Sequence, residues 1–285
     1  FIRDFPGVRW YVQKLKGHFF WLKDSIRNIV KERRKEIERT PEDQELTHDL
    51  LTMFLTINTP RDVTEKIADS LHDQPMSDEE ISGNFLEAVS AGIDTSSNTL
   101  CFIVHFLSHY PNVRERLVEE IDRVFGKDPN HQITFEDIGK LKYCEASIRE
   151  CLRVFSIIPV MFKKNTNPDI VGGLLYPADT QFYINLQGIH KQKSLWSNPE
   201  EFNPDRFMDK NNPESKNSLY IFGGGMKKCP GRNLAMLELK TSLSLLYRKY
   251  DVELVDMNAP INYYTTAVRT CRELKLRFKK REIWR

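Results

Sequence analysis

Residues 222–232 read Phe-Gly-Gly-Gly-Met-Lys-Lys-Cys-Pro-Gly-Arg, a glycine-rich segment that carries a single cysteine. Three consecutive glycines allow tight turns that residues with a Cβ atom resist. The thiol of Cys229 lies among three cations, and apolar residues at helical spacing follow over 233–247. The segment therefore places a thiol at a helix N-terminus beside positive charges. Both features favour the thiolate, the form that binds metals or attacks electrophiles.

The order Phe-x-x-Gly-x-x-x-Cys-x-Gly within this segment is rare. It is formed by Phe222, Gly225, Cys229 and Gly231. At average residue usage, with Gly near ~7%, the pattern arises by chance in roughly one chain in a thousand of this size. The alternative to a functional thiol is a buried structural cysteine behind a flexible glycine turn. Other motifs in the chain are needed to distinguish these two interpretations.

The composition of the 285 residues is that of a soluble globular protein with one large domain or two modest ones. Lys+Arg is 42 against Asp+Glu 40, a balance that gives no support to nucleic-acid binding. The sequence contains no apolar run near the ~20 residues that span a bilayer, and no secretory signal opens it. Its five cysteines are scattered and include no CxxC pair, which argues against a disulfide framework. The first residue is Phe1 rather than Met, so we expect the true N-terminus to lie upstream.

A long helix is predicted over 77–109. A capping box of Ser77 and Glu80 opens it, and the residues that follow are apolar on more than one side, which indicates a helix that crosses the middle of the protein. Its centre, Ala91-Gly92-Ile93-Asp94-Thr95, concentrates poor helix formers, and a glycine alone costs about 1 kcal/mol relative to alanine. This stretch is either a functional interruption or a kink with Asp94 turned to water.

A second helix, predicted over 142–154, carries two acid–arginine pairs at helical spacing. Glu150 and Arg153 lie three residues apart, and Glu145 and Arg149 lie four apart. Either pair can meet on one face of the helix, so spacing alone does not choose between them.

Beyond this helix the chain is more irregular. The segment 204–207 reads Pro-Asp-Arg-Phe and belongs to proline-punctuated chain with one embedded arginine. Alternating residues predict strands over 181–186, 251–255 and 273–278. The sum is a mainly α fold with a minor antiparallel β-sheet.

These motifs resemble those of the cytochrome P450 family, in the same order and over nearly the whole chain. The family's oxygen-handling helix has a small residue, Gly, any residue, an acid and Thr, and its haem loop has the Phe-x-x-Gly-x-x-x-Cys-x-Gly order. A Glu-x-x-Arg motif and a Pro-x-Arg-Phe segment complete the set. The matching residues are Ala91, Gly92, Asp94 and Thr95; Glu150 and Arg153; Pro204, Arg206 and Phe207; and Phe222, Gly225, Cys229 and Gly231.

The resemblance implies a cytochrome P450 fold whose N-terminal part is missing, with residues 1–285 forming a partial domain. In it, 77–109 is the oxygen-binding helix, 142–154 the Glu-x-x-Arg helix and 222–232 the haem-ligand loop. The implied structural cluster, buried and mutually satisfied, consists of Glu150, Arg153 and Arg206.

The cofactor implied by the resemblance is haem b, with the Cys229 thiolate as ligand of the iron. The residues implied in binding it are Phe222, Gly225, Lys227, Cys229, Gly231 and Lys164. The two lysines stand where the family commonly has arginine. We therefore expect weaker anchoring of the haem propionates, because lysine lacks the bidentate fork of arginine.

The activity implied is the insertion of one oxygen atom from O₂ into a lipophilic organic substrate. The resemblance gives Thr95 a hydrogen bond to bound dioxygen and Asp94 a proton relay, while Ala91 and Gly92 let haem and oxygen approach the helix. Apolar residues available to the substrate are Phe85, Val89, Ile158, Val160 and the turn around Tyr264 to Ala267.

The implied electron source is NADPH, acting through a reductase, or a cytochrome b-type donor. Either partner would dock on the side of Lys227, Lys228 and Arg232. The resemblance also implies attachment to the cytoplasmic face of the endoplasmic reticulum membrane, through the missing N-terminal part.

Two alternative functions stay open at this point. Some relatives use the same haem for isomerase or dehydratase chemistry and often lack the acid–Thr pair, so Asp94 and Thr95 argue against that assignment. The second alternative is a truncated, non-catalytic fragment that cannot hold haem.

Overall fold

The structure, a computed structural model, describes residues 6–63, 74–126, 128, 131–209 and 218–282. It divides into two compact units, the first ending at Ala91 and the second beginning at Gly92. Each unit has its own cluster of buried apolar side chains.

The first unit contains α1 (Pro6–Arg39), α2 (Leu50–Thr56) and the beginning of α3 (Asp78–His109). Its core consists of Ile26, Val30, Leu51, Leu55 and Ile81. The predicted capping box is present at the start of α3. The Ser77 amide donates to Glu80 Oε2 at 2.8 Å, and the Glu80 amide donates to Ser77 Oγ at 3.3 Å. Two orphan amides are thereby satisfied by residues three positions apart.

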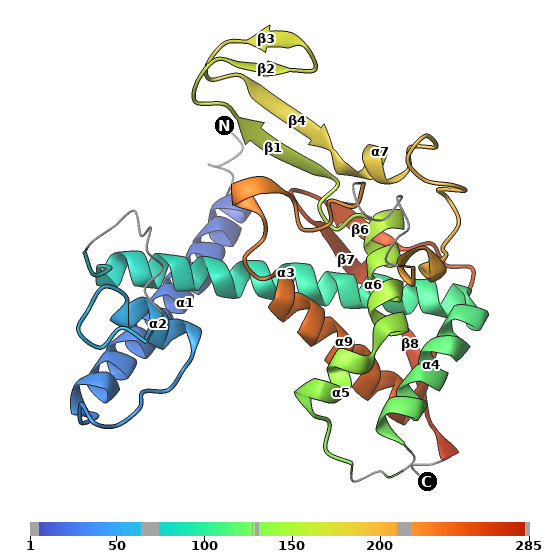
Figure 1. Cartoon of the computed structure of the whole chain (residues 1–285), viewed down its shortest axis with the longest axis horizontal. Coiled ribbons are helices and arrows are strands. Elements are labelled where there is room, and N and C mark those ends of the chain that lie inside the picture. Colours follow the sequence, from blue (N-terminus) through green and yellow to red (C-terminus); the bar gives the residue numbers. More distant parts are fainter. Residues whose placement is uncertain (1–5, 64–73, 127, 129–130, 210–217, 283–285) are drawn as a thin grey trace. The chain divides into compact units, whose positions relative to one another are not determined.

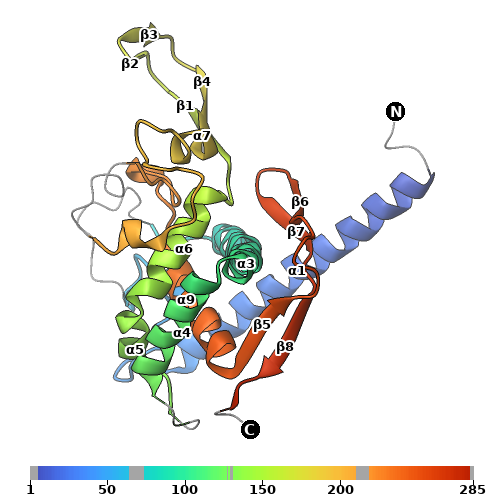
Figure 2. The same ribbon diagram turned by 90° about the vertical axis from the view of Figure 1, so that its right-hand side faces the viewer.

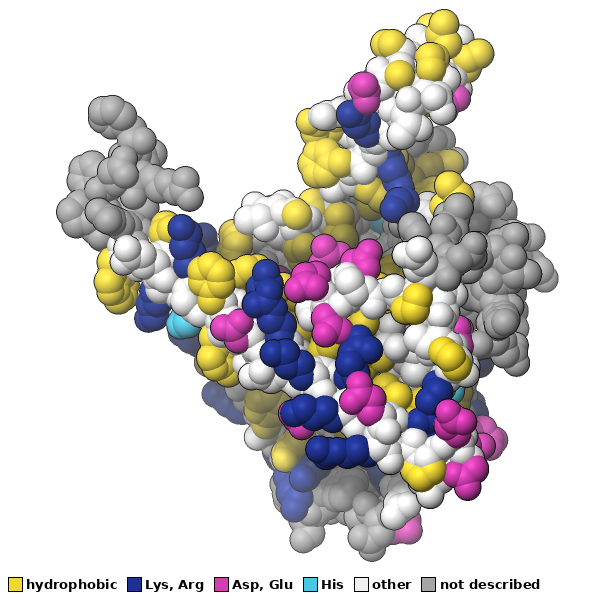
Figure 3. Space-filling view, turned by 90° about the vertical axis from the view of Figure 1, so that its left-hand side faces the viewer, with side chains coloured by type: hydrophobic (Ala, Val, Ile, Leu, Met, Phe, Trp, Pro, Cys, Tyr) yellow, Lys and Arg dark blue, Asp and Glu magenta, His cyan; other side chains and the backbone are white. Residues whose placement is uncertain are grey.

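Charged side chains of both signs are mixed on the surface shown in Figure 3. In the C-terminal half of α1, Arg33 pairs with Glu36 at 3.1 Å and with Asp49, which precedes α2, at 2.6 Å.

The second unit holds the remainder of α3 and most of the other helices. They are α4 (Pro111–Phe125), α5 (Phe135–Lys140), α6 (Lys142–Val154), α7 (Leu186–His190) and α9 (Arg232–Lys249), with the 3₁₀ turns η2 (Pro204–Phe207) and η3 (Gly225–Lys227). α6 lies at the centre of this unit, where it packs against α4, α7, α9 and η2 (Figures 1 and 2). Ten of its thirteen residues are buried, so α6 is held from nearly all sides.

The N-terminus of α6 is capped by a residue from another helix. Leu141, at the cap position, makes no side-chain hydrogen bond. The buried carboxylate of Glu120, on α4, instead accepts from the amides of Lys142, Tyr143 and Cys144 at 2.8–2.9 Å. A carboxylate at a helix N-terminus satisfies orphan amides and complements the helix dipole.

All the strands pair antiparallel, in four sheets of two strands among the described residues. The pairs are β1 (Val160–Lys164) with β4 (Gln181–Asn185), β2 (Asp169–Val171) with β3 (Leu174–Tyr176), β5 (Tyr250–Leu254) with β8 (Leu276–Lys280), and β6 (Asn262–Thr265) with β7 (Arg269–Glu273). The predicted mainly α fold with minor antiparallel β structure is confirmed.

Two details of the strand prediction are wrong. The β structure forms separate hairpins and ladders rather than one sheet. The strand predicted over 273–278 is in fact the end of β7 and the start of β8, because residues 274 and 275 leave the ladder. There the Val255 amide donates to the Lys275 carbonyl at 3.0 Å. Alternation of side chains continues through such a break, so the sequence pattern does not reveal it.

Within the described parts of the chain, no helix is long and apolar enough to cross a membrane.

Candidate functional site

The segment from Tyr220 to Gly231 forms a closed loop stabilised by its own backbone. The Gly223 amide donates to the Tyr220 carbonyl at 3.0 Å, and the Cys229 amide donates to the Phe222 carbonyl at 2.9 Å. Gly223 and Gly225 have φ values of 70° and 67°. These left-handed conformations favour glycine, which explains why the turn needs glycine at both positions.

Cys229 is presented outward at the start of a helix. Its residue is exposed, whereas Cys144 and Cys151 are buried and burial raises the pKa of their thiols. Two residues later Gly231 is the N-cap of α9. A Cβ atom at Gly231 would lie 3.9 Å from Cys229 Sγ, so the missing side chain keeps the thiol clear on this side. The loop therefore offers an accessible sulfur ligand.

A cleft of about 560 Å³ lies beside this loop. Phe222, Lys228 and Arg232 line one part of it, and Glu145 and Arg149 of α6 line another. The last two form an ion pair at 2.8 Å. The cleft therefore extends from the ligand loop to the partly exposed ion pair of α6.

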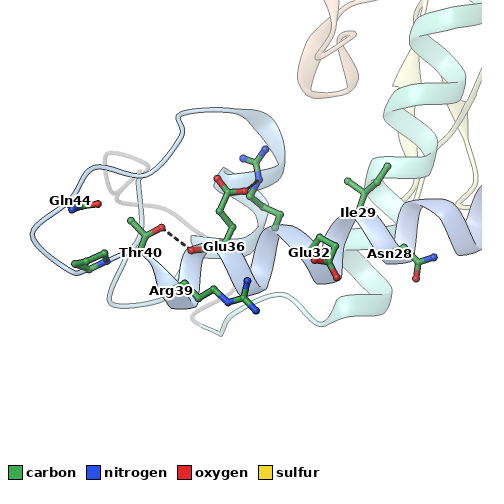
Figure 4. Close-up of a pocket in the computed structure, with 9 residues that line it drawn as sticks. Asn28, Ile29, Glu32, Glu36, Arg39, Thr40 and Gln44 are labelled. Carbon is green, nitrogen blue, oxygen red and sulfur yellow. Dashed lines mark hydrogen bonds and ion pairs between the residues drawn. The ribbon is translucent and has the colours of Figure 1, made fainter.

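A second hollow, of about 760 Å³, lies in the first unit along the C-terminal half of α1 (Figure 4). Its lining runs from Asn28 to Gln44, and Thr40 Oγ1 donates to the Glu36 carbonyl at 2.7 Å. None of the residues that line it belongs to the predicted site.

The acid–Thr stretch lies inside α3, which is continuous from Asp78 to His109. Ala91 closes the first unit, whereas Gly92, Asp94 and Thr95 belong to the second unit together with Cys229. Asp94 is exposed and Thr95 is half-buried. A kink is not needed to turn Asp94 outward, because an unbroken helix already does so.

Neighbouring side chains tie this part of α3 to the rest of the second unit. Asn98 Oδ1 accepts from the Cys271 amide of β7 at 2.7 Å, and Asn98 Nδ2 donates to the Asp94 carbonyl at 2.7 Å. Ser96 Oγ lies 3.3 Å from Glu238 Oε2 on α9, the helix that follows the ligand loop. The backbone that carries Asp94 and Thr95 is therefore held from two sides.

The structure brings Glu150, Arg153 and Arg206 together in the interior. Arg153 Nε and Nη2 donate to the two oxygens of Glu150 at 2.7 and 2.8 Å, and Arg206 Nε lies 3.4 Å from Glu150 Oε1. The side chains of Glu150 and Arg153 are 0% exposed and that of Arg206 is 5% exposed. Of the two candidate pairs on α6, this one is buried, and Glu145 with Arg149 is not.

Arg153 is satisfied further by backbone carbonyls. Its guanidinium donates to the carbonyls of His190, Pro199 and Glu201 at 2.8–2.9 Å. It also lies over the ring of Trp196 at 5.1 Å from the centroid. All five donors of arginine are thus matched in a place where an unpaired charge would be costly.

The two lysines expected to meet haem propionates are both exposed. Lys227 ends the turn η3 in the ligand loop. Lys164, in β1, pairs with Asp179 at 2.7 Å, with 54% of its side chain exposed. An exposed pair of this kind is weak and leaves the ammonium group easy to redirect.

A comparison with protein-family models matches residues 5–278 of the chain to the cytochrome P450 family. The chain belongs to the cytochrome P450 family.

Curated relatives of this cytochrome P450 include three from fly and mouse. Cytochrome P450 4d2 of Drosophila melanogaster is 30% identical over 80% of this chain and 46% of the relative. The mitochondrial sterol 26-hydroxylase of Mus musculus is 32% identical over 65% of this chain and 35% of the relative. The lanosterol 14-alpha demethylase of Mus musculus is 30% identical over 77% of this chain and 44% of the relative. The chain spans less than half the length of these relatives.

Solved structures show the same fold. The crystal structure of the cytochrome P450 CYP102L1 matches 99% of this chain and 60% of that chain, with a TM-score of 0.79 and 23% identity. A mutant haem domain of cytochrome P450DA matches 98% of this chain and 57% of that domain, with a TM-score of 0.82 and 22% identity.

The residues of this cytochrome P450 fit the haem that the family implies. An exposed thiol is the soft donor that iron in a thiolate-ligated haem requires. It stands on a loop turned by Gly223 and Gly225 at positive φ and left open at Gly231, with the exposed ammonium group of Lys227 two residues away to pair with a propionate.

Two residues of the second unit make buried contacts but belong to no motif recognised in the sequence. Glu120 caps α6 from α4, and His190 is completely buried beside Arg153. In these contacts the partners of both residues lie more than 20 residues away in the chain, so no motif or periodicity in the sequence indicates them.

Proposed function

We propose that this chain is the haem-ligand part of a haem-thiolate monooxygenase that inserts one oxygen atom from O₂ into a lipophilic organic substrate. The second oxygen atom leaves as water, with two electrons that come from NADPH through a reductase and two protons. The observation that carries the proposal is the accessible thiol of Cys229 on a loop closed by the hydrogen bond to Phe222.

On the ligand side, Cys229 supplies the thiolate, and Phe222, Gly225 and Gly231 shape the loop that presents it. When bound, a haem with a thiolate ligand supplies dioxygen activation, because the sulfur donates electron density that favours O–O cleavage. Lys227 and Lys164 are the cations that would pair with the haem propionates. Lys164 would first have to leave its exposed ion pair with Asp179.

On the oxygen side, four residues of α3 have distinct tasks. The hydroxyl of Thr95 donates a hydrogen bond to dioxygen, and the exposed carboxylate of Asp94 passes protons from solvent, which is general-acid work. A Cβ atom at Gly92 would meet nothing within 4 Å, so this face of the helix is open to a ligand. Ala91 keeps the adjoining surface small.

The electron-donor surface is the exposed basic side of the ligand loop. Lys227 and Lys228 are exposed, and Lys228 and Arg232 line the cleft of about 560 Å³. Cations around a concave surface suit an acidic reductase, or a cytochrome b-type donor, because opposite charges steer association.

The substrate class is lipophilic. Two of the relatives are named for the hydroxylation of a sterol and the demethylation of lanosterol. In this chain Ile158 and Tyr264 expose 37% and 41% of their surface, and both belong to the second unit, as the ligand loop does. Location at the cytoplasmic face of the endoplasmic reticulum membrane is part of the same proposal.

The decisive experiment is the CO spectrum of the reduced chain after haem is added. We expect a strongly red-shifted Soret band, which reports thiolate ligation. Cys229→Ser removes the sulfur ligand and should abolish the band, whereas Cys271→Ser, a control at a cysteine that is half-buried, should keep it. A wild-type chain without the band would refute the proposal and favour the non-catalytic fragment.

Oxygen consumption distinguishes the proposed monooxygenase from the remaining alternative, a haem-thiolate isomerase or dehydratase. A monooxygenase consumes O₂ and NADPH with product, whereas an isomerase or dehydratase forms product without either. Product formation under strict exclusion of O₂ would therefore overturn the monooxygenase assignment.

A further inference from the structure

His190 ends α7 and is completely buried, although no sequence motif includes it. Both nitrogens of its ring and its backbone carbonyl make hydrogen bonds. Nδ1 lies 2.9 Å from Ser156 Oγ, and Nε2 lies 3.1 Å from the Tyr220 amide nitrogen. The carbonyl accepts from Arg153 Nη1 at 2.8 Å. One residue thus contacts α6, the chain that follows α6 and the start of the ligand loop.

The contacts define which ring nitrogen carries the proton. A backbone amide can only donate, so Nε2 of His190 must accept the hydrogen bond from Tyr220. The proton of the neutral ring is then on Nδ1, which donates to Ser156 Oγ. Burial, together with the charge of Arg153, lowers the pKa of His190 to about 4, so the neutral ring persists near pH 7.

Tyr220 is the point where the ligand loop begins. Its carbonyl accepts from the Gly223 amide at 3.0 Å, and the Phe222 carbonyl accepts from the Cys229 amide at 2.9 Å. The Tyr220 ring also lies 3.6 Å from the position that a Cβ atom of Gly224 would take. A residue nine positions before the thiol is therefore linked to it by two short backbone contacts.

We propose that His190 is a positioning residue for Cys229: its Nε2 holds the Tyr220 amide and attaches the ligand loop to the buried pair of Glu150 and Arg153. The inference rests on the proposed function, because it concerns the loop that presents the iron ligand. His190 acts through Tyr220 and not on the thiol. The buried pair supplies rigidity, since Arg153 holds the His190 carbonyl while Glu150 holds Arg153.

Two substitutions separate the two ring contacts. His190→Gln places its amide near the position of Nε2 and keeps an acceptor for Tyr220. His190→Asn places its amide near Nδ1 and keeps only the contact with Ser156. Ser156→Ala is the matched control, because it removes the buried contact at Nδ1 and leaves the one at Nε2.

The first measurement is hydrogen exchange of the Tyr220 amide, read by NMR in the chain without haem. We expect His190→Asn to raise its exchange rate about tenfold or more, the effect of losing one hydrogen bond. His190→Gln and Ser156→Ala should stay within about twofold of wild type at this amide. The Gly126 amide, which donates to the Asp122 carbonyl in α4 at 2.9 Å, serves as the internal reference.

The wild-type chain alone also tests the proposal, so a variant that fails to fold does not block the test. A scalar coupling between the Tyr220 amide nitrogen and His190 Nε2 should be present across the hydrogen bond. A ring proton on Nε2 instead would overturn the proposal.

The CO spectrum then distinguishes a failure of this inference from a failure of the proposed function. With haem bound, His190→Asn should lose the red-shifted band that His190→Gln retains. If the wild type lacks that band, the proposed function fails, and Tyr220 exchange still decides the positioning role. If the wild type has it and His190→Asn matches wild type in both exchange and spectrum, the positioning role is refuted alone.

Discussion

Thr95 presents its side chain from a backbone that is held at the next turn. Asn98 joins that turn to β7, and Ser96 reaches Glu238 of α9. A hydroxyl on such a backbone can keep one direction toward a ligand, which is what a hydrogen bond to dioxygen needs. The role proposed for Thr95 has a direct kinetic consequence.

Replacing Thr95 by alanine should uncouple electron use from product. Without the hydroxyl, the proton supply to dioxygen is misdirected, and we expect roughly tenfold more NADPH consumed per product formed. Thr95→Ser keeps the hydroxyl and should stay close to wild type. The measurement is the ratio of NADPH consumed to product formed. A wild-type ratio in Thr95→Ala would contradict the role given to this residue.

At the scale of elements, the buried cluster is the joint between α6 and the chain that returns past it. Arg153, near the end of α6, bonds carbonyls at residues 190, 199 and 201, while Glu150 accepts from Arg206 of η2. Charges removed from water need such complete pairing, because each unpaired one costs several kcal/mol.

Arg153→Lys should therefore destabilise the chain strongly. Lysine cannot supply five donors in the same fork, so we expect the free energy of unfolding to fall by about 3–5 kcal/mol. Arg149→Lys, on the same helix in a partly exposed pair, should cost less than about 1 kcal/mol. Urea unfolding of both variants measures the difference. Equal losses would show that burial does not distinguish the two pairs.

At the scale of the whole molecule, the half-buried His105 and the buried His190 make stability depend on pH. Burial lowers the pKa of both His105 and His190 to about 4, with His109 and Arg153 as the neighbouring charges. Their unfolded value is near 6.5. Between these values the unfolded chain binds more protons than the folded chain, so acid favours unfolding.

The free energy of unfolding should be greatest above pH ~6.5 and fall as the pH drops toward 4. The contribution of His190 is about 3 kcal/mol at the acid end, since each unit of pKa difference is worth ~1.4 kcal/mol. His190→Gln removes that contribution and should flatten the decline. Urea unfolding at intervals from pH 4 to pH 8 gives the two profiles. Parallel profiles for wild type and His190→Gln would contradict the prediction.

Much of the fold follows from residues close together in the chain. The capping box of Ser77 and Glu80 starts α3 within one residue of its predicted start, and periodicity over 142–154 identifies α6. The glycines of the ligand loop likewise act on their own backbone, where positive φ values at 223 and 225 demand them. Such features were predictable because their hydrogen bonds and dihedral angles involve neighbours only a few residues away.

Tertiary structure alone decided which polar side chains are buried and with whom. Spacing allowed two acid–arginine pairs on α6, and only packing against η2 and α7 removed one of them from water. Glu120 reaches the first amides of α6 from 22 residues away, and His190 reaches the Tyr220 amide across 30. Burial is a property of all the surrounding elements together. Local sequence therefore limits which partners a side chain can reach, and the assembled interior selects among them because a buried polar group without a partner is costly.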